Sequence, residues 1–536
     1  MHLKRESGPC VMAALVVTAS MRSYERPDES GHYERREALM SESLPEPNVA
    51  IGATVLRPDE KKYLDEHSLK KPMGTTHIWS LGVGAVITGE YFGWNGGLGV
   101  AGPIGMLIAS LFVCALYMAW VLALSELSVA MPFAGGPLAY GRRAVGPWLG
   151  FVMGWSMFLE CLFAAIGTGI ATGGCVYFVL SLLFPEISKA EATTAAALVT
   201  VALFALLQWI GAKEQAKIME WMTYGAIFAL VWFWIACIPG VKVERILTQP
   251  LLTDGWLGVL KAIPYAIWWL VIIESVALAA EEAHEPHRSI PRGLMLAQVT
   301  LIVLVVLTWF FASAAGNDYR VTGDGVKIPF PLQWVYREVW SDPKHAWHLI
   351  AFSLFAIFGM ISSYNGMLYA VSRQSFAMGR AGYLPSILGH LHPVRRTPDI
   401  SIFVWSLVIA GFVVWGYYNE AAVTVAVLTC NLTALIWYVL AMICLFVLRV
   451  KEPNMPRPYK VPLYPFLPAL VIVMSLFAAL VYGWLNEPVV LWLTLAMYAI
   501  GLTYFFGYAR TRLSTAAPEE LTARPSSLGD AAETGR

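Results

Sequence analysis

Residues 81–97 read Leu-Gly-Val-Gly-Ala-Val-Ile-Thr-Gly-Glu-Tyr-Phe-Gly-Trp-Asn-Gly-Gly, an apolar run interrupted by glycines and one acid. Seven glycines lie between Gly82 and Gly99, and each weakens a helix by roughly 1 kcal/mol relative to alanine. Glu90 stands in the middle, where a carboxylate in lipid is unfavourable unless it faces a wet cavity or a partner. The run therefore predicts a membrane helix that is broken to line a binding cavity. The alternative is that the glycines allow close helix packing and that Glu90 is a protonated structural residue.

The rest of the chain has the composition of a membrane protein. It has 536 residues, of which 57% are apolar and 14% are charged, whereas roughly 25% are charged in ordinary soluble domains. Between residues 75 and 512 only 45 of 438 residues are charged, which is too few to cover a soluble surface. Soluble enzymes, nucleic-acid binders and disordered proteins are therefore excluded. The 37 basic and 37 acidic residues balance, so net charge gives no argument for a polyanion partner.

Twelve apolar runs are long enough to cross a bilayer, which requires about 20 residues. Lipid forces each run into a helix, because no water is present to satisfy an open backbone. The predicted fold class is an all-α polytopic membrane protein with 12 transmembrane helices. The runs cover roughly 77–98, 104–130, 147–183, 191–211, 216–238, 256–280, 291–315, 347–371, 399–417, 421–448, 466–485 and 489–509.

The basic residues predict the orientation of these helices. If the N-terminus is cytoplasmic, the inner loops between spans carry 14 Lys and Arg residues and the outer loops carry 8. The positive-inside rule then places both termini in the cytoplasm. The expected location is the cytoplasmic (inner) membrane. We expect a mobile cytoplasmic tail over residues 1–76, a transmembrane domain over 77–510 and a cytoplasmic tail over 511–536.

Two further acids lie within predicted spans, Glu160 in the third and Glu274 in the sixth. The sixth span follows the first by five, and a repeat of odd length inverts its topology. Residues 77–238 and 256–448 are therefore expected to form inverted repeats that meet at the first and sixth spans. Structural and functional roles are equally open for Glu160. Glu274 is expected to stabilise a break in the sixth span rather than to contact a substrate.

Four ordered motifs resemble those of the amino acid–polyamine–organocation permeases. They are LSVAMPFAGGPLAY at 127–140, ESVALAAEEAHEPHRSIPR at 274–292, SRQSFAMGRAGYLP at 372–385 and KEPNMPRPYKVP at 451–462. The resemblance covers roughly residues 75–510. It implies the leucine-transporter-like fold of five plus five helices in inverted repeats, with two extra helices at about 466–509. It also implies alternating access around spans one, three, six and eight.

The chain departs from the family pattern at the break in the first span. The family usually carries Gly-Ser-Gly there, and the bare amides receive a substrate carboxylate, as the N-terminus of a helix does. The matching residues here are Thr88, Gly89 and Glu90. Two carboxylates in a pocket of low dielectric repel each other, so a zwitterionic α-amino acid should be rejected. A small cation without a carboxylate would instead neutralise Glu90.

Within the family, GEYFGWN at 89–95 and AIPYAIWW at 262–269 resemble ethanolamine permeases. We therefore expect a secondary active permease that imports a small organic amine, ethanolamine above all. An amino acid or polyamine permease of the same family is the alternative. A membrane enzyme or sensor is the competing class. An enzyme would need a reactive cluster at membrane depth, and the ten histidines lie in tails, loops or span ends, so we expect no enzymatic activity.

The predicted substrate site combines acids, hydroxyls and aromatic rings. The rings offer cation–π faces worth roughly 0.5–2 kcal/mol each, although they are equally compatible with lipid-facing bulk. We expect no metal and no cofactor, and proton or sodium coupling, uniport and exchange all stay open. The expected partners are a small cationic amine and the lipid bilayer, without nucleic acid and without an obligate protein partner. The predicted binding residues are Thr88, Gly89, Glu90, Tyr91, Trp94, Glu160, Trp269, Glu274 and Ser362.

Overall fold

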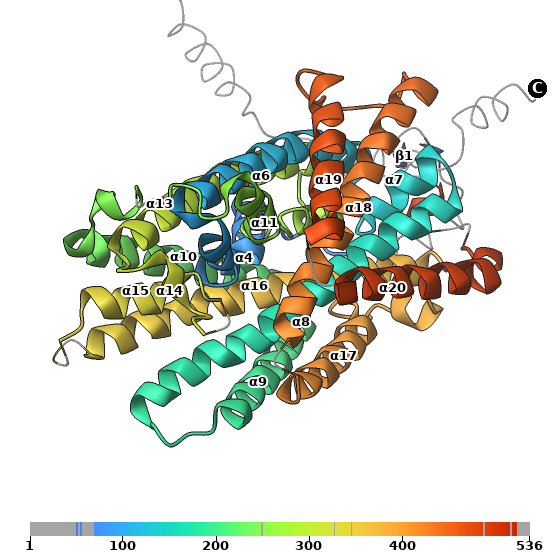
Figure 1. The fold of residues 1–536 in the computed structure, drawn as a ribbon. Helices are drawn as coiled ribbons and strands as arrows, with labels where there is room; N and C mark the ends of the chain where they lie inside the picture. Colours follow the sequence, from blue (N-terminus) through green and yellow to red (C-terminus); the bar gives the residue numbers. More distant parts are fainter. Residues whose placement is uncertain are drawn as a thin grey trace, which may run out of the picture. The chain divides into compact units, whose positions relative to one another are not determined.

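The computed structural model describes residues 50–51, 54–55, 69–247, 250–325, 327–342, 344, 346–419, 421–485, 488–514 and 517–521, and it is almost entirely helical (Figure 1). A small antiparallel pair, β1 (Ala50–Ile51) and β2 (Thr54–Val55), precedes the helices. The α-helices are α4 (Thr75–Val86), α5 (Thr88–Tyr91), α6 (Gly96–Ala130), α7 (Gly136–Ala144), α8 (Pro147–Leu183), α9 (Lys189–Ile210), α10 (Ala212–Cys237), α11 (Gly255–Ile267), α12 (Ser275–Leu278), α13 (Pro286–Ala315), α14 (Tyr319–Thr322), α15 (Pro331–Val339), α16 (Ala346–Arg380), α17 (Asp399–Tyr417), α18 (Ala422–Lys451), α19 (Phe466–Leu485), α20 (Pro488–Gly507) and α21 (Pro518–Leu521). Short 3₁₀ turns are η1 (Ile238–Gly240), η2 (Val243–Arg245), η3 (Ala280–Glu282), η5 (Ser386–Gly389) and η6 (Ala509–Thr511).

Ten helices in the described part of the chain are long and apolar enough to cross a membrane: α6, α8, α9, α10, α13, α16, α17, α18, α19 and α20. Several predicted runs agree closely with them, and the run predicted at 147–183 is α8. The first and sixth runs are instead divided into shorter pieces, α4 with α5 and α11 with α12. The all-α, multi-pass membrane architecture is thus confirmed.

One predicted boundary is supported and another is wrong. Helix α6 contains a break at Gly102, whose φ of 73° and ψ of 173° are not helical and favour glycine. This break separates the run predicted at 77–98 from the run predicted at 104–130. The eighth run was expected to end at residue 371, whereas α16 continues to Arg380. Its added turns contain Arg373 and Arg380, which form ion pairs with Glu282 and Glu281.

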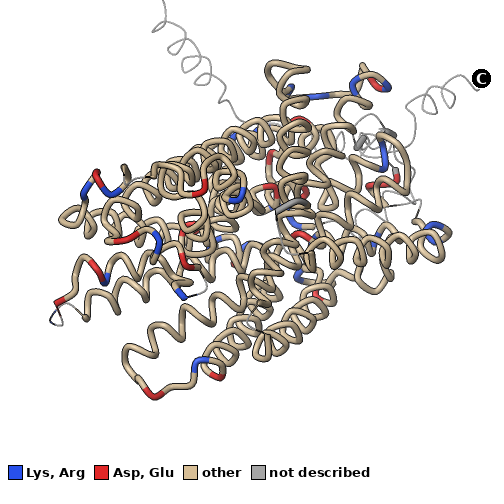
Figure 2. Tube along the Cα trace, viewed as in Figure 1, with Lys and Arg blue, Asp and Glu red and all other residues tan. Residues whose placement is uncertain are grey.

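Charge is concentrated at helix ends and in loops, while the long helices are mostly free of it (Figure 2). Helix α8 lies at the centre, in contact with α9, α16 and α18. Helices α17 and α20 keep large apolar side chains such as Leu407 and Trp492 exposed. An exposed apolar side chain on a long helix is what a lipid-facing surface requires.

Two short segments that the sequence assigns to the tails pack against the helices. The Met73 amide donates to the Glu282 carbonyl at 3.1 Å, and the His284 amide donates to the Met73 carbonyl at 2.9 Å. Near the other end, Glu519 in α21 is buried against Arg380. Apart from 50–51, 54–55, 69–76 and 511–514 with 517–521, the predicted tails lie outside the described residues.

Glu126, at the end of α6, joins three segments. Its carboxylate accepts hydrogen bonds from Arg449 at 2.7 and 2.6 Å, and it lies 3.3 Å from the Arg457 guanidinium. It also accepts the Val461 amide at 2.8 Å. Its side chain is buried, so these partners are what make the charge tolerable there.

We predict that Glu126→Gln destabilises the protein by about 3–5 kcal/mol, because two arginines lose their shared counter-charge. The measurement is thermal or denaturant unfolding of the purified protein in detergent. Asp254→Asn is the matched control, since Asp254 pairs with Lys261 at 2.6 Å on the surface and an exposed pair contributes no more than about 1 kcal/mol. Equal stability of the two variants would contradict the structural role of Glu126.

Candidate functional site

The first broken helix is interrupted by a side chain that enters its hydrogen-bond ladder. The Ser363 hydroxyl of α16 donates to the Gly84 carbonyl at 2.8 Å and accepts the Thr88 amide at 2.9 Å. It thereby replaces the direct bond that an α-helix would form between residues 84 and 88. The helix therefore divides into α4 and α5 without leaving these two backbone groups unsatisfied.

The chain stops being helical after Tyr91. Phe92 is extended, with φ −157° and ψ 164°, and Gly93 follows with φ 89°. This second angle lies in the left-handed region that glycine enters readily. A Cβ atom at position 93 would also lie 2.8 Å from the Trp268 ring. Glycine is therefore required at this turn both by the backbone and by the neighbouring ring.

The sixth span has its own break between α11 and α12, over residues 268–274. Ile272 there has φ 78°, and a β-branched residue in this region is strained by roughly 1–3 kcal/mol. The two breaks are in direct contact, because a Cβ atom on Gly89 would lie 2.5 Å from the Trp268 carbonyl oxygen. Backbone therefore packs on backbone at the point where the sequence predicts the substrate site.

Glu90 is completely buried in α5, and neither carboxylate oxygen forms a hydrogen bond of normal geometry with a described residue. Thr308 of α13 interacts with it, but its hydroxyl also has no hydrogen bond of normal geometry. Cys114 of α6 also interacts with Glu90, but a cysteine cannot supply a positive charge. Glu90 is thus deep in the protein, and no positively charged side chain among the described residues pairs with it.

Glu160 and Glu274 are brought together, although 114 positions separate them in the sequence. Glu160 of α8 accepts a hydrogen bond from Trp437 at 2.5 Å. Glu274, the residue before α12, accepts one from Tyr438. Trp437 and Tyr438 lie on α18 and were missed by the sequence analysis, because no local pattern links them to acids so far away in the chain.

The predicted aromatic residues are buried, so the lipid-facing interpretation is wrong for them. Trp94 stacks on Trp269 with centroids 4.5 Å apart and an interplanar angle of 21°. Trp94 donates to the Glu90 carbonyl at 3.1 Å, and Trp269 donates to Ser110 at 3.1 Å. Tyr91 donates to the Ala226 carbonyl of α10 at 2.6 Å. These bonds fix the rings between the two breaks and their neighbours.

The hydroxyl residues occupy the junction of α4, α10 and α16. Thr88 Oγ1 lies 3.2 Å from Met360 Sδ. Ser362 lies 3.4 Å from the Thr223 hydroxyl and 3.6 Å from Met219 Sδ. It is Ser363, the second serine of the pair, that contacts the broken backbone directly. A serine next to another serine gives no sequence signal to tell which of them faces the break.

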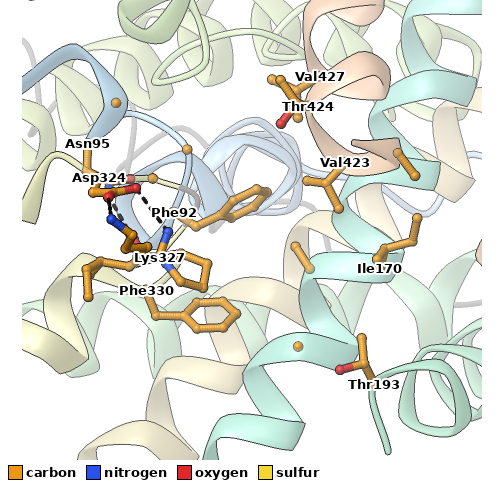
Figure 3. A pocket seen from close by; sticks show the side chains of 18 of the residues that line it. Phe92, Asn95, Ile170, Thr193, Asp324, Lys327, Phe330, Val423, Thr424 and Val427 are labelled. Carbon is orange, nitrogen blue, oxygen red and sulfur yellow. Dashed lines mark hydrogen bonds and ion pairs between the residues drawn. The ribbon is translucent and has the colours of Figure 1, made fainter. Parts of the chain in front are cut away.

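A cavity of about 1080 Å³ lies beside the two breaks (Figure 3). Its lining includes Phe92 and Gly93 from the first break and Trp268 from the second, together with loop residues that follow α14. Phe92 and Trp268 meet edge to face with centroids 5.5 Å apart. None of the nine predicted binding residues, all of them described, lines this cavity. Phe92 and Trp268 thus give the cavity an aromatic wall at the two breaks.

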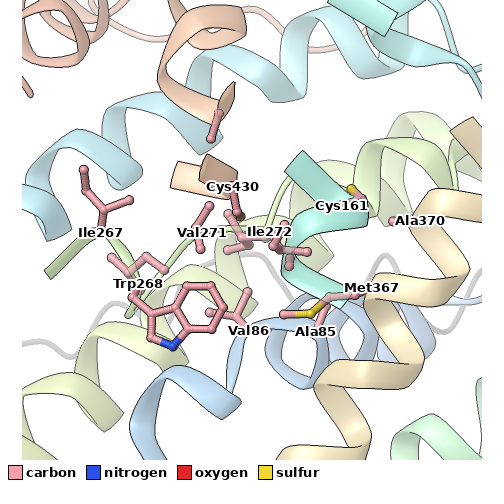
Figure 4. Close-up of a cluster of buried hydrophobic side chains, with 14 of the residues drawn as sticks. Ala85, Val86, Cys161, Ile267, Trp268, Val271, Ile272, Met367, Ala370 and Cys430 are labelled. Carbon is pink, nitrogen blue, oxygen red and sulfur yellow. The ribbon is translucent and has the colours of Figure 1, made fainter. Parts of the chain in front are cut away.

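The centre of the protein is otherwise apolar and closely packed (Figure 4). Six segments contribute to it: α4, α8, α11, the sixth-span break, α16 and α18. The labelled side chains are Ala85, Val86, Cys161, Ile267, Trp268, Val271, Ile272, Met367, Ala370 and Cys430, all of them buried. Charges near this core therefore act in a medium of low dielectric.

A second charged cluster, after α12, contains its own cation. Arg380 donates to Glu281 at 2.9 and 2.6 Å and to Glu519 at 2.8 Å. Burial alone would raise the pKa of Glu281, but Arg380 and the amides of Ala134 and Leu69 outweigh burial and hold that pKa below its ordinary value. Because a lowered pKa preserves the carboxylate down to acidic pH, the contact persists through the neutral range.

Comparisons with known proteins agree with this architecture. Residues 77–510 match the family model described as amino acid permease. The chain is 27% identical to a branched-chain amino acid permease of Bacillus subtilis over 468 residues, which are 83% of this chain and 94% of that protein. It is 28% identical to an uncharacterized transporter of Rhizobium meliloti, covering 76% and 86%. It is 25% identical to a methylthioribose transporter of Bacillus subtilis, covering 83% and 94%.

We predict that Gly89→Ala destabilises the protein by about 1–3 kcal/mol, because the new methyl group must push the two breaks apart. Thermal unfolding in detergent measures the effect. Gly411→Ala in α17 is the matched control, since no atom lies within 4 Å of a Cβ atom at that exposed position. If both variants melt at the wild-type temperature, the backbone contact between the breaks does not hold the structure.

Proposed function

The chain belongs to the amino acid permease family, and from this premise we propose that it is a secondary active permease that imports a small organic amine, ethanolamine above all. Membership makes it a transporter and not an enzyme. The proposed mechanism is alternating access around the two broken helices, with the ammonium group of the substrate received by Glu90.

One observation carries the proposal. Glu90, Glu160 and Glu274 are all fully buried, and no Lys, Arg or His of the described residues forms an ion pair with any of them. Buried arginines are present, but Arg373 is paired with Glu282 and Arg380 with Glu281. A buried negative charge without a cation is strongly unfavourable. A site with this imbalance favours a substrate that brings positive charge only.

Ethanolamine has the chemistry that this site lacks. Its ammonium would neutralise Glu90, and the faces of Trp94, Trp269 and Tyr91 would add cation–π attraction. Its neutral hydroxyl would bond to Thr88 or Ser362 beside the break. Glu160 and Glu274 would complete the acidic wall of the same site, with Gly89 leaving room for backbone contact.

The proposed topology has twelve spans, five plus five in inverted repeats with two extra helices, and both termini in the cytoplasm. Two observations support it: the broken helices are the first and the sixth, and they touch each other. With this orientation the cavity of Figure 3 opens toward the outside, because its lining includes loop residues that follow α14 and α17. We propose that Phe92 and Trp268 separate this outer cavity from Glu90.

An amino acid permease is the second candidate function. It is favoured by the relative from Bacillus subtilis that is 27% identical to this chain and is named as a branched-chain amino acid permease. An amino acid would bring a carboxylate as well as an ammonium group, and in this chain Glu90 repels that carboxylate. The substrate competition described below separates the two candidates.

We predict that Glu90→Gln abolishes ethanolamine uptake, because the only formal charge facing the ammonium in the first break is removed. Uptake of labelled ethanolamine into proteoliposomes measures the effect, and size-exclusion profiles check that the variant inserts and folds. Glu186→Gln is the control, since Glu186 is an exposed loop residue, and it should transport at the wild-type rate. Uptake by Glu90→Gln at the wild-type rate would contradict the proposal that the Glu90 carboxylate receives the ammonium group.

Competition in the same vesicles tests the substrate class. Unlabelled ethanolamine should block uptake, whereas alanine and glutamate in equal excess should not, because each brings a carboxylate to Glu90. Putrescine and choline test whether a second cation or a bulky ammonium is accepted. Strong inhibition by alanine with none by ethanolamine would favour the amino acid permease.

A further inference from the structure

Recognition of one ammonium group by Glu90 does not explain why Glu160 and Glu274 lie next to each other. Two adjacent residues of α18, Trp437 and Tyr438, hold one carboxyl group each, and the two carboxyl groups interact with each other. They come from different segments, α8 and the end of the sixth-span break, and both side chains are completely inaccessible. Two acids placed in contact inside an apolar core require an explanation in terms of charge.

The hydrogen bonds leave one oxygen free on each acid. Trp437 donates to Glu160 Oε2 and Tyr438 donates to Glu274 Oε1. Glu160 Oε1 and Glu274 Oε2 have no hydrogen-bond partner among the described residues. An indole N–H is only a donor, so the oxygen that it contacts must accept. The Tyr438 hydroxyl also lies 3.1 Å from the Tyr117 hydroxyl, to which it can donate while it accepts from Glu274 Oε1. The proton that the pair needs therefore belongs on Glu274 or on Glu160 Oε1.

Electrostatics fixes how many protons the pair holds. Two carboxylates in contact at low dielectric cannot both stay ionised, so one takes up a proton that both share. Among the described residues, every other titratable side chain that interacts with the pair is a tyrosine or a cysteine, and both types are mainly uncharged at neutral pH. These are Tyr117 of α6, Cys161 of α8, Cys430 and Tyr438 of α18, and Tyr498 of α20. No base among them competes for the proton.

We propose that the Glu160–Glu274 pair is a proton-binding site that couples transport to the proton gradient. A proton from one side of the membrane binds between the two acids and is released to the other side when the site reopens. While it is bound, it joins the sixth-span break to α8, and through Trp437 and Tyr438 to α18. Without it, two negative charges repel each other across the same contact, which favours separation of the break from α8. The inference rests on the chain being a transporter and does not require that ethanolamine be the substrate.

The test compares uptake of labelled ethanolamine into proteoliposomes with and without an inward proton gradient. If one proton accompanies one substrate, a gradient of one pH unit supports up to about tenfold accumulation, since each pH unit is worth about 1.4 kcal/mol. Wild type and the exposed control Glu186→Gln should show this dependence. Glu160→Gln and Glu274→Gln should show a ratio of about one between the two conditions, whatever their basal rate. A variant that keeps the wild-type ratio overturns the proposal.

An infrared titration of the substrate-free protein gives a second, independent measurement. The carbonyl band of a protonated carboxylic acid should be present in wild type and in Glu90→Gln, and it should lose the component of the pair in Glu160→Gln/Glu274→Gln. An unchanged band in that double variant overturns the proposal even if the variant is inactive in transport. Absence of ethanolamine uptake by wild type, with the band lost in the double variant, would instead refute the proposed substrate and support the proton site.

Discussion

A bilayer offers no water to the protein backbone, so every amide and carbonyl at membrane depth must find its partner inside the protein. The centre of this structure depends on how that constraint is met where two helices are interrupted. Ser363 supplies a hydroxyl between Gly84 and Thr88, and Gly89 lets the other broken segment approach at van der Waals distance. The strained backbone of Ile272 persists because close packing on all sides holds it. The breaks are thus features that their surroundings stabilise.

Charge is distributed by the same principle. Arg373, Arg380 and Arg449 are each bound to an acid near helix ends, which makes these cations tolerable away from water. Glu90 and the Glu160–Glu274 pair remain without a cation among the described residues. The acids near the helix ends are therefore paired with arginines, whereas the acids at the centre have no cation of the described residues beside them. A mobile cation, whether proton or ammonium, is the physical complement of such a centre.

The helices were predictable because hydrophobicity acts locally. A run of apolar residues must be helical in lipid whatever its neighbours are, which is why 147–183 agrees with α8. Glycine content alone located the break in the first span. Where the prediction failed, at the last turns of α16, the reason was tertiary. Ion pairs made this helix end tolerable inside the protein.

The sequence by itself determined that this chain is a polytopic helical membrane protein of the permease type, and it singled out Glu90 as the unusual acid of the first break. Only the tertiary structure decided what each side chain faces. Trp437 reaches Glu160 across 277 positions, and Ser363 of α16 bonds to the backbone on both sides of the first break. Hydropathy is a property of each segment, whereas a contact between distant segments depends on how all the helices pack together. That is why the membrane fold could be predicted from local sequence and the pairing of the two central acids could not.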